Sequence, residues 1–148
     1  MPIVATLTRN FIYEAGKASF DFSSDAFRLI LMRDGYVFNS VFHSIYSNVS
    51  AIEIDSMGGY SKLAKVLNAS SPWAINEDGT SSIYFQPASF ISMDPGMEDF
   101  SAALIVQYNS GDPNASIIVG CIDFGSTMSI PPSAAFNIKN TGVILGAT

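Results

Sequence analysis

The sequence predicts an all-β fold with one or two short helices, built as a β-sandwich or, within that class, a jelly roll. Three observations predict it. Apolar residues gather in short runs, turn-forming residues separate these runs at intervals of about 8–12 residues, and helical periodicity is weak. The chain has 148 residues, which fits one domain of ordinary size. We therefore expect a single sandwich domain over residues 1–148, with residues 1–10 as an extended N-terminal arm.

The first half of the chain contains one clear strand and one ambiguous segment. Residues 27–32 form a compact apolar run that the turn signal Asp34-Gly35 closes. Residues 61–67 alternate polar and apolar residues, a pattern compatible with a strand or a short helix.

The middle of the chain predicts a hairpin and a further strand. Residues 73–75 and 83–85 flank Asp78-Gly79, a dipeptide typical of tight hairpin turns. Residues 90–93 form the next short strand, which Asp94-Pro95-Gly96 closes.

The clearest hairpin lies later in the chain. Residues 101–108 and 116–124 are almost continuously apolar and flank a turn cluster rich in Ser, Gly, Asp, Pro and Asn. Such strands are typical of the centre of a sheet, where both faces are covered. After Pro131-Pro132, residues 134–138 and 142–145 predict a final pair of strands.

Two segments have helical features. Residues 8–16 begin with Thr8, a preferred N-cap residue, and end with Gly16, a common C-terminal stop. Residues 38–49 have apolar residues at i, i+3, i+4 and i+7 spacing, but their many β-branched and aromatic members have low helix propensity.

The chain has few charges, and they are unevenly placed. Charged residues make up 14% of the sequence, against about 25% in a typical soluble domain. This predicts neutral or apolar surface covered by a neighbouring subunit, with a neutral Ser- and Asn-rich monomer as the alternative. Residues 76–148 carry the whole net charge of −6. They would repel phosphates and anionic lipids, so we expect no nucleic-acid and no membrane partner.

The residue inventory offers little for catalysis or metal binding. His43 is the only histidine and Cys121 the only cysteine, which excludes a structural zinc site. Cys121 lies in an apolar run, as a buried inert thiol does, and we expect His43 to be a surface or packed residue. We therefore predict no enzyme activity, no cofactor and no metal.

Paired carboxylates could run glycoside hydrolysis if one member were desolvated. Each pair lies beside Gly, Ser or Asn in predicted loops, so we expect solvated turn residues. A calcium loop at residues 94–99 lacks the alternating ligand spacing of such sites. The pairs are Asp21 with Asp25, Glu53 with Asp55, Glu77 with Asp78, and Glu98 with Asp99.

The candidate protein-interface residues are apolar or aromatic. Pro2, Ile3 and Val4 would form the docking part of the N-terminal arm. Trp73 and Tyr60 are aromatic residues of the kind that anchor interfaces. Deleting the first ten residues is then expected to leave the domain folded but to weaken binding to its assembly.

The order of several short motifs is more specific than any one of them. They are Phe20-Asp21-Phe22 before the 25–32 run, Val49-Ser50-Ala51-Ile52-Glu53-Ile54 followed by Gly58-Gly59-Tyr60, the 103–108 run, Ile122-Asp123-Phe124-Gly125, and Phe136-Asn137-Ile138 with Gly142-Val143-Ile144-Leu145. Over nearly the whole chain they resemble a family of small tailed-phage virion structural proteins. The chain departs from the family at residues 90–93, where a Thr-Trp pair is usual, and at Pro131-Pro132, which replaces a Ser/Asn-rich turn.

The resemblance implies a virion protein that decorates or cements the outside of a phage head. Its partners would be the major capsid protein and other copies of itself, and it would carry no catalytic residues. A tail or fibre component, or a receptor- or glycan-binding module, is the alternative, with Tyr36, Tyr46, Tyr60 and Trp73 as exposed stacking residues. A glycosidase that uses paired acids is a third hypothesis.

Overall fold

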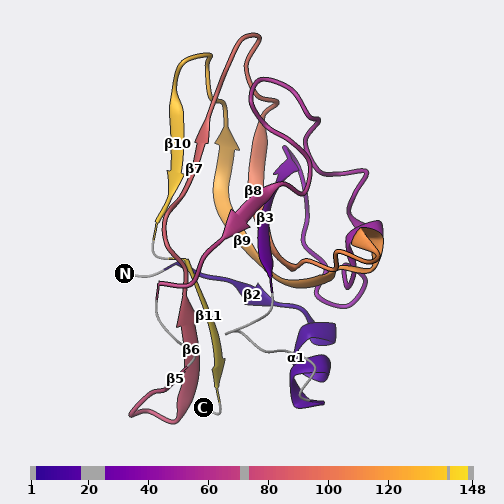
Figure 1. The fold of residues 1–148 in the computed structure, drawn as a ribbon, viewed down its shortest axis with the longest axis vertical. Coiled ribbons are helices and arrows are strands. Elements are labelled where there is room, and N and C mark those ends of the chain that lie inside the picture. The colour runs from indigo at the N-terminus through magenta and orange to yellow at the C-terminus, as the bar shows by residue number, and fades with distance from the viewer. Residues whose placement is uncertain (1–2, 18–25, 71–73, 140, 147–148) are drawn as a thin grey trace.

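The computed structural model describes residues 3–17, 26–70, 74–139 and 141–146, and these residues form three β-sheets and one short α-helix (Figure 1). The expected mostly β character is therefore confirmed, with strands that are mostly antiparallel. The large sheet has the order β2 (Thr6–Leu7), β9 (Ile117–Met128), β8 (Phe100–Gln107), β3 (Phe27–Arg33) and β4 (Lys65–Leu67). A second sheet has the order β1 (Ile3–Val4), β11 (Thr141–Gly146), β6 (Thr80–Tyr84) and β5 (Ala74–Ile75), and a third pairs β10 (Ala135–Ile138) with β7 (Ala88–Ile91).

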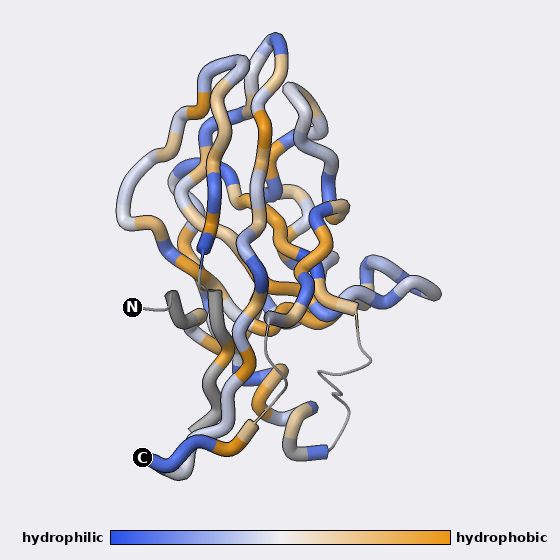
Figure 2. The backbone as a smooth tube through the Cα atoms, turned by 60° about the vertical axis from the view of Figure 1, so that its left-hand side comes forward, coloured by the Kyte–Doolittle hydropathy of each residue, from blue (hydrophilic) through white to orange (hydrophobic). Residues whose placement is uncertain are grey.

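Strands β8 and β9 form the predicted hairpin and are central, as their apolar runs indicate. Residues on opposite faces of β8 belong to separate apolar clusters: Ile105 packs in one and Leu104 in the other, and both are fully buried. Because a strand directs alternate side chains to opposite faces, two covered faces require the near-continuous apolar sequence. Figure 2 shows the hydrophobic positions gathered in the middle of the molecule and hydrophilic ones at its upper loops.

The helix α1 (Arg9–Gly16) forms where residues 8–16 predicted it. The Thr8 hydroxyl accepts a hydrogen bond from the Phe11 amide at 3.1 Å and donates one to the Ile118 carbonyl at 2.5 Å. The same side chain therefore caps the helix and fastens it to β9.

Residues 38–49 contain no α-helix. They contain turns and the single 3₁₀ turn η1 (Tyr46–Asn48). The Asn39 carboxamide oxygen accepts from the Val41 and Phe42 amides, and the Asn48 oxygen accepts from the Ser44 and Ile45 amides. Side chains that bind nearby backbone amides compete with helix formation, and here they override the apolar spacing.

A second 3₁₀ turn, η2, spans Pro113–Ala115.

Two expectations about the chain ends are wrong. Strands β10 and β11 both form but do not pair with each other, because β10 pairs with β7 whereas β11 pairs with β6 and β1. Residues 3–7 are not an arm extended away from the domain, since β1 pairs with β11 and β2 pairs with β9. Gly120 permits the second pairing, because a Cβ there would lie 2.7 Å from the Thr6 carbonyl oxygen.

Candidate interaction site

A pocket of about 340 Å³ opens between β4 and β7. Just beyond β4, residues 68–70 pair with residues 84–86: the Ser70 amide donates to the Tyr84 carbonyl at 2.8 Å, and the Gln86 amide donates to the Asn68 carbonyl at 2.7 Å. On one side of this bridge the chain continues into β4 and β7, which do not pair with each other. β4 pairs with β3, and β7 pairs with β10. We call this opening the fork. It is lined by residues 59–61, 64–66 and 90–91.

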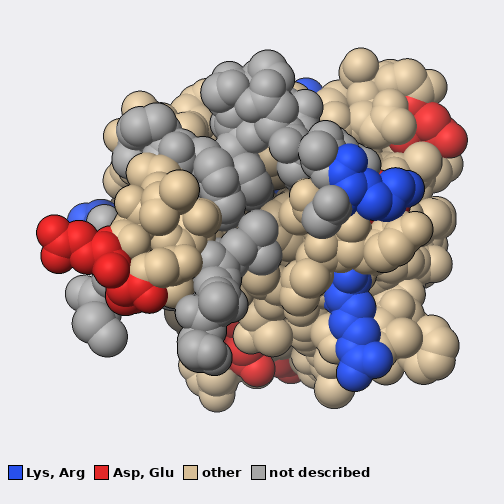
Figure 3. Space-filling model, turned by 90° about the horizontal axis from the view of Figure 1, so that it is seen from below, with Lys and Arg blue, Asp and Glu red and all other residues tan. Residues whose placement is uncertain are grey.

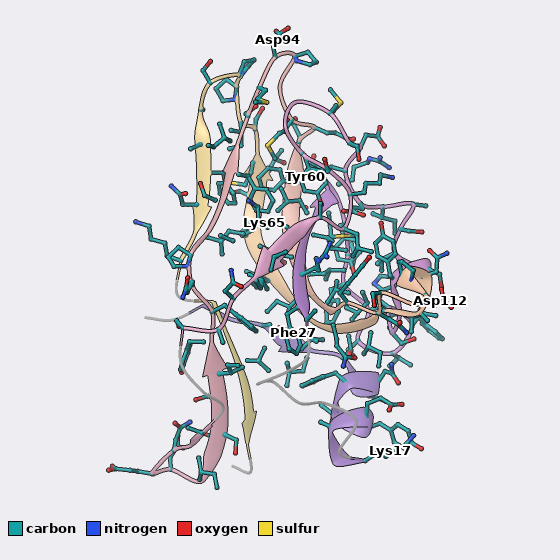
Figure 4. The ribbon with its side chains drawn as sticks, in the orientation of Figure 1. Lys17, Phe27, Tyr60, Lys65, Asp94 and Asp112 are labelled. Carbon is teal, nitrogen blue, oxygen red and sulfur yellow. The ribbon has the colours of Figure 1, made fainter. Side chains whose placement is uncertain are left out.

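Aromatic rings and one cation line the inner part of the fork. Tyr60 and Phe90 are each 4% exposed, and their ring centroids lie 5.9 Å apart. The Lys65 ammonium lies 5.0 Å from the centroid of the Phe90 ring, which is within cation–π range. Figure 4 shows Lys65 beside Tyr60, between β7 and β3.

The rim of the fork is aliphatic and exposed. Val66 is 50% exposed and Ile91 is 63% exposed. Met93 is also exposed, and it adjoins Gly59, where a Cβ would lie 3.3 Å from the Met93 side chain. Exposed aliphatic residues around a recess mark surface that a ligand or partner can cover.

Lys65 differs from the other cations near it. Lys62 lies 3.8 Å from an Asp55 oxygen, and Arg33 pairs with Glu98 and, at 3.5 Å, with Asp55. Among the residues that the structure describes, no carboxylate lies within ion-pair distance of Lys65. Its charge is therefore available to a group that enters the fork.

The turn beside the fork is held close to the strands. Gly59 has φ +90°, and a Cβ there would lie 2.5 Å from the Ile91 carbonyl oxygen. Only glycine combines this backbone conformation with so close an approach. The Met93 amide also donates to the Gly58 carbonyl at 2.8 Å, so this wall of the fork is tied to the residues after β7.

The expectation that Glu53 is a solvated turn acid is wrong. It is fully buried, and its carboxylate accepts hydrogen bonds from the Tyr46 hydroxyl, the Tyr60 hydroxyl at 2.5 Å and the Leu63 amide at 2.9 Å. The Tyr60 oxygen in turn accepts from the Leu31 amide of β3 at 3.0 Å. A buried carboxylate needs such donors to offset its lost hydration.

Tyr46 and Tyr60 are consequently not exposed stacking residues, contrary to expectation. They are 7% and 4% exposed. Burial, together with the Glu53 carboxylate, raises the pKa of both phenols well above the usual value, so both remain protonated donors. The Glu53 network fixes the Tyr60 ring in the wall of the fork.

Glu98 is a second acid that proves to be structural. Its carboxylate binds the Arg33 guanidinium and accepts from the Asp55 amide at 3.1 Å. The Arg33 hydrogen bond holds the pKa of Glu98 below its ordinary value. By contrast, Glu77 and Asp78 are exposed in the turn between β5 and β6, as expected.

Burial affects both residues that were considered for nucleophilic chemistry, Cys121 and His43. Cys121 is 4% exposed, which confirms the expected burial of this thiol, and that burial raises its pKa to about 12. His43 Nδ1 lies 2.7 Å from the Tyr36 hydroxyl and accepts from the Asn39 amide at 3.1 Å, so His43 is packed, and burial lowers its pKa.

Several predicted positions lie outside the described residues: Pro2, Asp21, Asp25 and Trp73. Ile3 and Val4 form β1. The described part of the chain holds no cluster of three His, Cys, Asp or Glu side chains suited to a metal ion. Nor does it contain a helix of the length and apolar character needed to cross a membrane.

Comparisons with protein-family models, curated proteins and solved structures find no match to this chain.

Proposed function

We propose that this chain is a non-enzymatic structural subunit of a bacteriophage particle, which decorates or cements the head by binding the major capsid protein and other copies of itself. The observation that carries the proposal is exposed apolar surface in a chain with few charges. Around the fork it includes Val66, Ile91 and Met93, and beside α1 it includes Val37 at 81% and Phe42 at 73% exposure. Surfaces of this kind are typical of subunits that are covered in an assembly.

The distribution of charge and the motif order support the same proposal. In the view from below (Figure 3), charged side chains occupy isolated places and most of the described surface is uncharged. The ordered motifs that end in Ile122-Asp123-Phe124-Gly125 supply the link to phage virions. A decoration protein acts through many copies, so each contact needs only a modest free energy.

The proposal includes a β-sandwich arrangement of the sheets. Ile83 of β6, Phe90 of β7 and Val143 of β11 belong to the same apolar cluster as Leu31 and Ile105 of the large sheet. One cluster shared by strands of different sheets supports a fold in which the sheets pack face to face.

Particle stoichiometry tests the proposal. Purified phage particles are separated into heads and tails, and the chain is quantified in each by gel densitometry against the major capsid protein. Decoration requires a copy number comparable with that of the capsid protein, confined to heads. A few copies restricted to tails would contradict it and favour the tail or glycan-binding alternative, for which the burial of Tyr46 and Tyr60 leaves fewer stacking residues.

A further inference from the structure

We propose that the fork binds an extended peptide segment of a partner protein, which adds as a strand to the free edge of β4 and places a carboxylate on Lys65. This inference deepens the proposed function, because it rests on that function for where the segment comes from. The binding itself can be measured on the isolated chain.

The backbone of β4 presents an unused edge to the fork. Along an antiparallel strand, successive residues direct their N–H and C=O groups to opposite sides. The Asn68 carbonyl and the Ser70 amide point toward residues 84–86. Val66 lies two residues before Asn68, so its backbone N–H and C=O groups point to the same side.

The hydrogen bonds of β3 to its neighbouring strands give the same direction for the Val66 backbone groups. The Tyr108 amide donates to the Ala26 carbonyl, so Arg28, two residues after Ala26, directs its groups to β8. Val66 lies opposite Arg28, and this pair is therefore not hydrogen-bonded. The N–H and C=O groups of Val66 face the fork, where β7 does not pair with β4.

The side chains select the occupant. An extended segment has side chains on alternate sides, so one residue can contact the exposed Val66 and Ile91 while its neighbour turns toward Lys65. Lys65 has no carboxylate partner in the described part of the chain, although the protein carries a net charge of −6. Charge complementarity therefore favours an acidic residue beside an aliphatic one. Main-chain hydrogen bonds supply affinity in this mode of recognition, and such side-chain contacts supply specificity.

Titration of the ¹⁵N-labelled chain with a short peptide tests the inference. The probe is acetyl-Ser-Val-Asp-Val-Ser-amide, and its matched control replaces Asp with Asn. We expect saturable amide shifts in residues 64–66 and at Ile91, with slower hydrogen exchange at the Val66 amide. Loss of a partly exposed ion pair should weaken binding of the Asn peptide about fivefold.

Two pairs of variants separate the contributions. Lys65→Met should weaken the Asp peptide about fivefold and leave the Asn peptide unchanged, whereas Lys139→Met removes an exposed charge elsewhere and should change neither. Val66→Pro removes the N–H that faces the fork and should abolish binding, whereas Val66→Thr keeps it and should bind. If Val66→Pro does not fold, the comparison of Lys65→Met with the two peptides still decides the question.

Three results would overturn the inference. They are absence of saturable binding, shifts centred outside the fork, and equal affinity of both peptides for the native chain. Concentration-dependent shifts at Val66 without peptide, together with a dimer in sedimentation, would assign the fork to a second copy instead. Peptide binding can fail while the chain is abundant on heads, or succeed while it is absent from them, so the two proposals fail separately.

Discussion

Glu53 lies between two isoleucines, but Ser50, Ser56 and Gly58 nearby predicted a solvated turn acid. The structure buries it between Tyr46 and Tyr60, which lie seven residues before and seven residues after it. That symmetric spacing of two phenols about one acid was the available signal, but its meaning depends on a loop that folds back over β3. Local composition predicts turns well and cannot show which turn is covered by the core.

The hydrogen bonds of Glu53 should contribute several times more to the free energy of unfolding than an exposed acid does. Glu53→Gln replaces a carboxylate that accepts three hydrogen bonds with an amide that offers a single acceptor oxygen. We expect a loss of about 2–4 kcal/mol in the free energy of unfolding, measured by urea denaturation. Glu77→Gln, at an exposed turn position, is the matched control and should change stability by less than about 0.5 kcal/mol. Equal effects would contradict the buried role.

Cys121 should be unreactive in the folded chain. Burial raises its pKa to about 12, above the ordinary value, so the neutral thiol is the folded-state form at every pH below that value. Between pH 8 and pH 10 an exposed thiol becomes a reactive thiolate, and this one does not. A thiol reagent at pH 8.5 should react slowly with the native chain and rapidly in 8 M urea. Equal rates would show that the side chain is accessible.

Elements defined by local signals could be predicted, and their pairing often could not. The cap Thr8 and the stop Gly16 bound α1, and two apolar runs around a turn cluster define the β8–β9 hairpin. By contrast, β10 and β11 are adjacent in sequence and lie in different sheets. Their partners come from residues 80–91 and, for β11, also from β1, so the pairing is decided by contacts that are distant in the sequence.

The cap of α1 provides a prediction at this scale. Thr8→Ala removes the hydroxyl that accepts from the Phe11 amide and donates to β9. We expect a loss of about 1–2 kcal/mol, seen as a lower midpoint in urea denaturation. Thr8→Ser retains the hydroxyl and is expected to recover most of that loss. If serine and alanine are equally destabilising, the hydroxyl does not account for the effect.

At the scale of the whole molecule, the N-terminal segment connects the two larger sheets. β1 belongs to the four-stranded sheet and β2 to the five-stranded sheet, although Ala5 alone separates them. The sequence favoured an arm here because Pro2-Ile3-Val4 is short and apolar, and an apolar segment serves a sheet edge equally well. The candidate interface residues also differ from those expected from the sequence. Tyr60 is a buried residue in the wall of the fork, and Lys65, Val66 and Ile91 line its more accessible part.

Removal of residues 1–8 should therefore destabilise the domain rather than only weaken its binding. The deletion takes away β1, β2 and the cap of α1, and we expect loss of cooperative unfolding or a fall of several kcal/mol in stability, about 3 kcal/mol or more. Thermal melts followed by circular dichroism would measure it. A deletion of residues 1–2 alone serves as control. An unchanged melting temperature for the longer deletion would instead support the expected N-terminal arm.

The pairing of β1 with β11, in which Ile3 lies opposite Thr141, also has a consequence for biosynthesis. On the ribosome the first strand is made long before the last, and β6 waits with one edge uncovered until residues 141–146 follow. During that interval the nascent chain presents a free strand edge, which can pair with another chain. Translation that stalls before Thr141 should therefore yield aggregation-prone chains, whereas a completed β11 covers this edge of β6.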